Sequence, residues 1–151
     1  MFLHKLVRFT LASLLVACAG PLSAGWMTIN IAGYMSRPRL LEARLTPSEP
    51  NVHVFDQIGK AITYSPPNGP AAVPETFTFR WRAEGDPGES EVVFAIRSKL
   101  PPHVLERLAS TRRPPHMLSL DFRVLHGQPE CVWSFTRLDS REGEEHGVIR
   151  P

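Results

Sequence analysis

Apolar and polar residues alternate along most of the chain from residue 26 onward, with a period of two. The clearest run spans residues 76–83, where one face holds Phe77, Phe79, Trp81 and Ala83 and the other holds Thr76, Thr78, Arg80 and Arg82. Such alternation is typical of a half-buried β-strand. It also predicts strands over residues 27–34, with Tyr34 on the polar face, and over 41–45, 118–124 and 131–138, although a short helical turn fits 41–45 almost as well. Residues 52–55 and 61–64 are two further short segments with strand propensity. The continuous apolar run over residues 92–96 predicts a central strand.

Turn-forming residues separate these strands. Residues 56–60 have the length and the glycine of a hairpin loop, so we expect the strands on either side of them to pair. Residues 126–129 separate the last two strands, which we expect to form an antiparallel hairpin. Residues 65–74 contain four prolines and an Asn-Gly pair, which predicts a loop.

One helix is predicted, over residues 103–110. Pro102 suits the first turn of a helix, because the amide that proline lacks has no partner there. Val104, Leu105 and Leu108 then form a single apolar stripe.

Short strands, proline-rich turns and one short helix together predict a mainly β fold. We expect a single-domain antiparallel β-sandwich, or a small open barrel, over residues 26–138. Residues 139–151 are rich in charge and contain two glycines, and we expect them to be a flexible tail.

The N-terminus has the form of a secretory signal. Lys5 and Arg8 precede a short apolar run over residues 9–17. Gly20 and Pro21 follow before the run reaches the roughly 20 apolar residues that a membrane-spanning helix needs. We therefore expect a signal segment and not a spanning helix.

The end of this segment, Leu15-Val16-Ala17-Cys18, resembles the lipobox of bacterial lipoproteins. The resemblance implies that residues 1–17 are a signal peptide, that the Cys18 thiol carries the lipid, and that residues 18–25 are a lipidated tether. Two or three fatty chains would anchor the protein stably to a membrane. Ala19, which stands where an aspartate would favour the inner membrane, implies the outer membrane by resemblance to lipoproteins of Gram-negative bacteria.

A second cleavage site remains open. Leu22-Ser23-Ala24 could end at a conventional signal peptidase site, although Leu22 is bulky for its position. Cleavage there would release a soluble periplasmic or secreted protein.

Processing changes the charge and the cysteine count. The 151 residues include 17 basic and 15 acidic side chains, and Lys5 and Arg8 account for the whole excess. A neutral mature chain gives no argument for nucleic acid as a partner. If Cys18 carries lipid, Cys131 has no partner within the chain, and its place beside Trp133 in an alternating segment favours burial over pairing between chains.

No arrangement of residues predicts catalysis. Residues 88–92 begin like a nucleophile elbow but lack its closing glycine, and the histidines are single and widely spaced. Asp121 and Glu130 could pair as carboxylates, but solvent-facing charges explain them more simply. We expect no enzyme activity, no metal and no cofactor other than the covalent lipid on Cys18.

Two features could bind a protein partner. The first is arginine, with Arg80 and Arg82 on one strand face and Arg112 and Arg113 in a predicted loop. Arginine is common in interface hot spots, although simple solvent exposure also explains these positions. The second is the proline-rich loop from Tyr64 to Pro74, with Tyr64 itself as a candidate contact, because binding residues concentrate on loops held by a rigid scaffold.

The order of short motifs resembles an uncharacterised family of bacterial lipoproteins found near type VI secretion effectors. The matching motifs are Trp26 to Ile31, Phe55-Asp56-Gln57-Ile58-Gly59, Arg80-Trp81, Leu100-Pro101-Pro102, Gly127 and Val132-Trp133. The resemblance implies a periplasmic immunity protein that neutralises a secreted effector. The alternative is a structural or assembly lipoprotein of the cell envelope or of a secretion apparatus.

Overall fold

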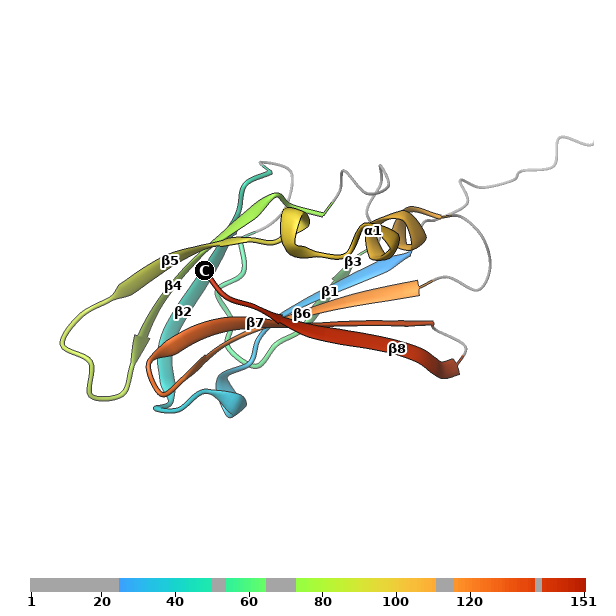
Figure 1. The fold of residues 1–151 in the computed structure, drawn as a ribbon. Coiled ribbons are helices and arrows are strands. Elements are labelled where there is room, and N and C mark those ends of the chain that lie inside the picture. The colour runs from blue at the N-terminus through green and yellow to red at the C-terminus, as the bar shows by residue number, and fades with distance from the viewer. Residues whose placement is uncertain (1–24, 50–53, 65–72, 111–115, 138–139) are drawn as a thin grey trace, which may run out of the picture.

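Two β-sheets lie face to face around one hydrophobic core (Figure 1). The computed structural model describes residues 25–49, 54–64, 73–110, 116–137 and 140–151. The larger sheet has the order β3 (Ile62–Tyr64), β1 (Trp26–Ile31), β6 (His116–Leu125), β7 (Gln128–Arg137) and β8 (Ser140–Ile149). The smaller sheet has the order β2 (Leu40–Pro47), β4 (Thr76–Ala83) and β5 (Ser90–Ala95). The prediction of a mainly β single-domain sandwich is confirmed.

One strand pair departs from the antiparallel prediction. β1 and β6 run parallel, with Trp26 opposite Met117 and Ile31 opposite Phe122, whereas every other pair of neighbouring strands in the two sheets is antiparallel. Parallel strands need a crossover connection, and here it passes through the whole smaller sheet and the helix.

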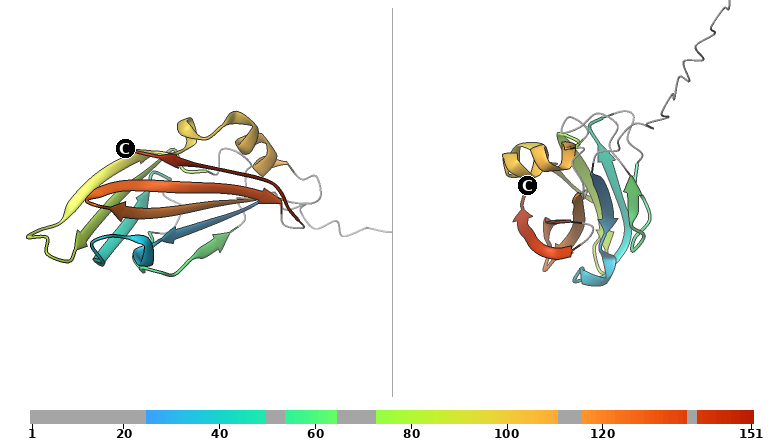
Figure 2. Two further views of the ribbon diagram at one scale, coloured as in Figure 1. Left: turned by 60° about the horizontal axis from the view of Figure 1, so that its bottom comes forward. Right: turned by 90° about the vertical axis from the view of Figure 1, so that its right-hand side faces the viewer.

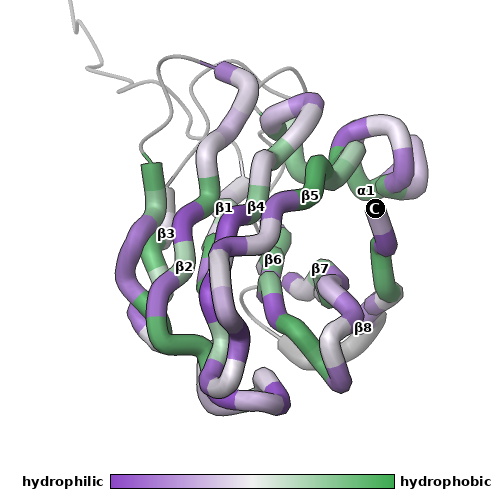
Figure 3. The backbone as a smooth tube through the Cα atoms, turned by 90° about the vertical axis from the view of Figure 1, so that its left-hand side faces the viewer, coloured by the Kyte–Doolittle hydropathy of each residue, from purple (hydrophilic) through white to green (hydrophobic). Residues whose placement is uncertain are grey.

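The core follows the alternation in the sequence. Figure 3 shows it as neighbouring purple and green positions along the strands. Phe122 on β6 lies at the centre of an aromatic cluster, with ring centroids 5.2 Å from Phe77, 5.3 Å from Phe94 and 6.1 Å from Phe79. These rings join the two sheets, and tilted pairs at such distances are favourable beyond their burial.

The predicted helix is α1 (Pro102–Ala109), and it buries Val104 and Leu108 against the core as expected. A 3₁₀ turn, η3 (Arg97–Lys99), leads into it. α1 and the C-terminus lie on the same side of the molecule (Figure 2). His103 Nε2 lies 2.6 Å from Glu145 Oε2 on β8, and Lys99 Nζ donates to the carbonyl of Arg150 at 2.6 Å. These contacts connect the helical segment to the last strand.

The expected hairpin of residues 52–55 and 61–64 is wrong for its described part, residues 54–55 and 61–64, and residues 52–53 lie outside the described residues. Phe55 instead exchanges two backbone hydrogen bonds with Leu45 on β2, of 2.7 and 3.0 Å. β3 pairs with β1, placing Thr63 opposite Thr28. Leu45 and Phe55 are both buried, so the segment before the turn gains core contacts in the smaller sheet while the segment after it extends the larger one.

The expected flexible tail is also wrong, because residues 140–149 form β8 along the edge of β7. Ile149 is buried opposite Cys131, and Gly147 lies opposite Trp133. A Cβ atom at Gly147 would lie 2.6 Å from Trp133 Nε1, so the glycine makes room for the indole. On the core-facing side of the described part of β8, only Ile149 is strongly apolar. The sequence therefore lacks the alternation of apolar and polar residues that predicts a strand.

Two other strand predictions are refined. Residues 41–45 are β-strand within β2 and not a helical turn. β5 lies at the edge of the smaller sheet rather than at its centre, and Val93 on it is 53% exposed.

The strands give the molecule two distinct ends (Figure 1). The N-terminal end holds Gly25, whose amide donates to Leu108 at 2.8 Å, and the start of β6. The far end holds the 3₁₀ turn η1 (Gly33–Met35), the start of β2, the β4–β5 turn and the β6–β7 turn. Backbone bonds join these far-end segments, including His126 N to Arg37 O at 2.7 Å and Glu84 N to Arg39 O at 2.8 Å. Within the described residues, no helix is long and apolar enough to cross a membrane.

Candidate functional site

Arg80 and Arg82 lie on the outer face of the smaller sheet, as the alternation predicts, but both are paired with carboxylates. Arg80 lies opposite Glu91 and bonds to it, and Glu89 is 3.9 Å away. The hydrogen bond and charge of Glu91 raise the pKa of the Arg80 guanidinium. Arg82 forms a 3.2 Å ion pair with Glu42 on β2. The outer face therefore does not present these two arginines as free cations.

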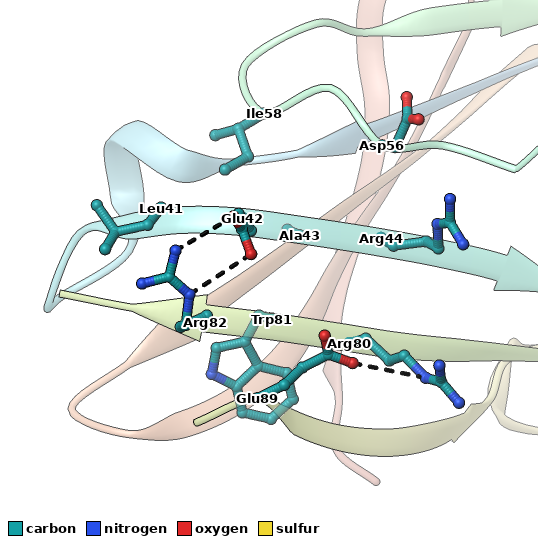
Figure 4. Close-up of a pocket in the computed structure, with 10 residues that line it drawn as sticks. All are labelled: Leu41, Glu42, Ala43, Arg44, Asp56, Ile58, Arg80, Trp81, Arg82 and Glu89. Carbon is teal, nitrogen blue, oxygen red and sulfur yellow. Dashed lines mark hydrogen bonds and ion pairs between the residues drawn. The ribbon is translucent and has the colours of Figure 1, made fainter. Parts of the chain in front are cut away.

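A shallow hollow of about 510 Å³ runs beside these arginines (Figure 4). Its wall includes Trp81, Glu42, Asp56, Ile58 and Arg44. Arg44 lies opposite Arg80 in the strand register and has no ion-pair partner among the described residues. Acidic and basic side chains are interleaved around this hollow, so it offers no field of one sign.

The remaining predicted site residues are not described at the level of their side chains. The backbone of Tyr64 ends β3, the edge strand of the larger sheet. Cys18, Arg112, Arg113 and the centre of the proline-rich loop lie outside the described residues.

The most exposed large apolar side chain of the far end, Tyr34, lies on η1. Tyr34 is 70% exposed and its neighbour Met35 is 39% exposed. The sequence alternation had assigned Tyr34 to the polar face of a strand, whereas β1 ends at Ile31 and the chain turns. The sequence does contain a signal for this turn. Gly33 directly precedes the two large side chains and Pro38 follows them, and glycine and proline at such spacing are typical of a turn.

Hydrogen bonds of Ser36 and Arg37 join this turn to β6. Ser36 is completely buried, and its hydroxyl donates to Ala32 O at 3.2 Å and accepts from the amide of Val124 at 3.1 Å. Arg37 N donates to Val124 O at 2.8 Å. The residues after β1 thus continue to bond along the edge of β6.

The guanidinium of Arg37 also binds the backbone of this turn. Its Nη1 donates to Tyr34 O at 2.9 Å and to Ser36 O at 2.7 Å. Gly33 packs so closely on Ile58 that a Cβ atom would collide with the Cγ2 methyl. Tyr34 and Met35 are therefore displayed on a fixed backbone.

A second hollow, of about 570 Å³, lies directly beside this turn. It is lined by Tyr34, Arg37, Pro38, Arg39, Ile58 and Glu84. Ile58 also lines the first hollow, so the two hollows adjoin. Among the described residues that line this second hollow, the only ion pair joins Arg39 and Glu84, and it is long at 3.8 Å and exposed.

A row of charged residues continues from Met35 across the larger sheet. Arg123 Nη1 lies 3.6 Å from Met35 Sδ, and its Nε and Nη2 contact Glu130 Oε1 at 2.8 and 2.6 Å. Arg150 Nη2 lies 3.7 Å from the other oxygen of Glu130. Glu130 is only 7% exposed, so the expectation that it is a simple solvent-facing charge is wrong. Asp121 accepts a 3.1 Å bond from Asn30, so the two carboxylates have separate partners.

The described residues contain no group of three histidine, cysteine or acidic side chains placed to hold a metal ion. Cys131 is completely buried on the core side of β7, which confirms the burial prediction. Burial raises the pKa of its thiol well above the ordinary value, with smaller contributions from Asp121 and Glu130. A buried neutral thiol is a poor nucleophile.

Comparisons of this sequence with protein-family models, with curated proteins and, for its fold, with solved structures gave no match.

Proposed function

We propose that the mature protein is a lipid-anchored binding protein of the bacterial cell envelope, facing the periplasm from the outer membrane, and that its partner is another protein. The observation that carries the binding role is Tyr34, which is 70% exposed on a turn whose supporting residue, Ser36, is completely buried.

Rigid display of an aromatic side chain favours binding for a physical reason. Tyrosine buries a large area on association, offers a hydroxyl for hydrogen bonding and loses little conformational entropy. Because the backbone around Tyr34 is already fixed by Ser36 and Arg37, a partner need not order it. Met35 and the adjoining hollow extend the apolar contact.

The proposed anchor orients this surface. Seven positions separate Cys18 from Gly25, so a tether attached at Cys18 reaches about 25 Å at most. A domain held so closely by its N-terminal end directs its far end into the periplasm, where Tyr34 would meet a partner. Confinement at the membrane also raises the effective concentration for partners that act there.

The resemblance in the sequence supports a secreted effector as the partner, which makes the protein an immunity protein. An assembly lipoprotein would use the same anchor, but its partner would be a resident envelope component. The two roles differ in what the cell needs the protein for, and this difference can be measured.

The anchor is tested by labelling cells with radioactive palmitate. The native chain should be labelled and Cys18→Ala should not. Equal labelling of both chains would contradict the lipid anchor.

The role is tested by purifying the full-length lipoprotein from detergent-solubilised cells and identifying what binds it. We expect one stoichiometric protein, and we expect its expression in the periplasm to stop growth only in cells that lack the lipoprotein. A resident envelope component with no toxicity would favour the assembly role, and the absence of any bound protein would contradict both.

A further inference from the structure

We infer that the partner presents an acidic segment, which docks across the far end of the sandwich with an apolar side chain against Tyr34 and Met35. This inference rests on the proposed function, because it takes the partner to be a protein. It names the surface and the chemistry that the surface selects.

The first argument is the balance of charge beside Tyr34. Among the described residues, the guanidinium of Arg37 hydrogen-bonds only to backbone carbonyls, and no carboxylate forms an ion pair with it. Its positive charge is therefore not neutralised within the described part of the chain.

The second argument is the row formed by Arg123, Glu130 and Arg150. One buried carboxylate faces two guanidinium groups, and Arg123 takes both of the short contacts. Among the described residues, the Arg150 side chain, which is 74% exposed, is left with a single 3.7 Å ion pair. The row thus carries a surplus positive charge at a position open to a partner.

The apolar and basic features are contiguous. Arg123 contacts the sulfur of Met35, so the row of arginines begins where the exposed apolar pair ends. A segment with an apolar residue flanked by acidic residues can contact Tyr34 and Met35 while its carboxylates bind Arg37 and Arg150. Guanidinium–carboxylate bonds are strong and directional, which suits such a contact.

The other charged face does not offer this chemistry. On the outer face of the smaller sheet Arg80 and Arg82 already bind Glu91 and Glu42. Arg44 has no ion-pair partner among the described residues, but it lines a hollow that also contains Glu42, Asp56 and Glu89. An acidic segment would have to displace the carboxylates bound to Arg80 and Arg82 and would meet further acidic side chains beside Arg44, whereas at the far end it meets the exposed guanidinium groups of Arg37 and Arg150.

A methyl NMR titration tests the inference without knowledge of the partner. The full-length lipoprotein in detergent, labelled at methionine methyl groups, is titrated with an acidic pentapeptide that has a central phenylalanine. A pentapeptide with lysine at each acidic position is the control. We expect the Met35 methyl signal to shift with the acidic peptide only, while the signal of the buried Met27 stays in place. Equal shifts with both peptides, or no shift at Met35, would overturn the inference.

The captured partner provides the second test. Arg150→Gln should weaken its binding about fivefold and reduce its dependence on salt, because one exposed ion pair is lost. Arg44→Gln, which removes an exposed arginine from the other face, should change affinity less than twofold. Tyr34→Ala should weaken binding about 30-fold, as expected for a central aromatic contact.

The outcomes separate the two proposals. If a partner binds but Arg150→Gln and Tyr34→Ala bind it as the native protein does, the docking surface is wrong and the binding role stands. If no partner is captured by the native protein, the proposed function fails and this inference fails with it.

Discussion

The hydroxyl of Ser36 accepts a 3.1 Å hydrogen bond from the backbone amide of Val124, between residues that are 88 positions apart in the chain. The bond supplies an acceptor that β1 does not, because β1 ends at Ile31, opposite Phe122, before it reaches Val124. Ser36 takes the place of a strand partner at the end of β6. The same residue therefore completes the sheet and fixes the turn that displays Tyr34.

Removing this hydroxyl should cost stability. Ser36→Ala leaves the buried amide of Val124 without a partner, and we expect the free energy of unfolding to fall by about 1–3 kcal/mol. Urea denaturation measures this change. Ser98→Ala, at an exposed position in η3, should stay within about 0.5 kcal/mol of the native protein. Equal effects of the two substitutions would show that Ser36 does not support the turn.

The buried carboxylate of Glu130 should matter more than exposed carboxylates. Glu130→Gln keeps the shape of the side chain but removes the charge that faces Arg123, whose side chain is largely buried. We expect a loss of about 1–3 kcal/mol in the free energy of unfolding. Glu84→Gln breaks only the exposed pair with Arg39 and should cost about 0–1 kcal/mol. The prediction fails if Glu84→Gln is the more destabilising change.

Close packing of Gly33 on Ile58 predicts a coupled pair of substitutions. Gly33→Ala forces the new methyl against Ile58 Cγ2, and overpacking of this kind typically costs about 1–3 kcal/mol. Ile58→Ala removes the colliding methyl. In the double variant the cost of Gly33→Ala should therefore be smaller than in the native background, and thermal unfolding of all four proteins measures the coupling. Strict additivity would contradict the collision.

Cys131 predicts a specific dependence of stability on pH. Because its pKa is raised in the folded state, the unfolded thiol ionises first as the pH rises. The contribution of the neutral thiol to the free energy of unfolding is fully present below the unfolded pKa of about 8.5. Above that pH the contribution is lost progressively, at up to about 1.4 kcal/mol per pH unit. Urea denaturation between pH 7 and pH 10 should show a steeper decline for the native protein than for Cys131→Ala. Identical slopes would mean that the thiol ionises equally in both states.

The parts of the fold that the sequence predicts correctly share one property, a strong local pattern. β4, β6 and β7 alternate large apolar residues with polar ones, and α1 combines a proline start with an apolar stripe. Their boundaries differ from the expected ones by only a few residues. The hairpin of β6 and β7 also follows from their proximity in the chain.

The parts that were predicted wrongly depend on partners far away in the chain. β8 has glycine and glutamate on its core-facing side, and only the indole of Trp133 explains Gly147. The pairing of Phe55 with Leu45 and of β3 with β1 cannot be distinguished from a local hairpin by composition alone.

The candidate site shows the same limit. Arg80 and Arg82 were correctly placed on an outer face, but their pairing with Glu91 and Glu42 depends on strand register. Tyr34 was missed because its support comes from Ser36 and Val124, which meet only in the folded chain. The exposure of an aromatic residue on a fixed turn depends on contacts between segments that are distant in the chain.

The most direct test of the central claim is photo-crosslinking in intact cells, with p-benzoylphenylalanine in place of Tyr34 in the full-length lipoprotein. The matched control carries the same group in place of Trp26, an aromatic residue of similar size at the N-terminal end. We predict one protein adduct from position 34 and none from position 26. An adduct from position 26 alone, or none from either position while the protein is present in the envelope, would contradict the account.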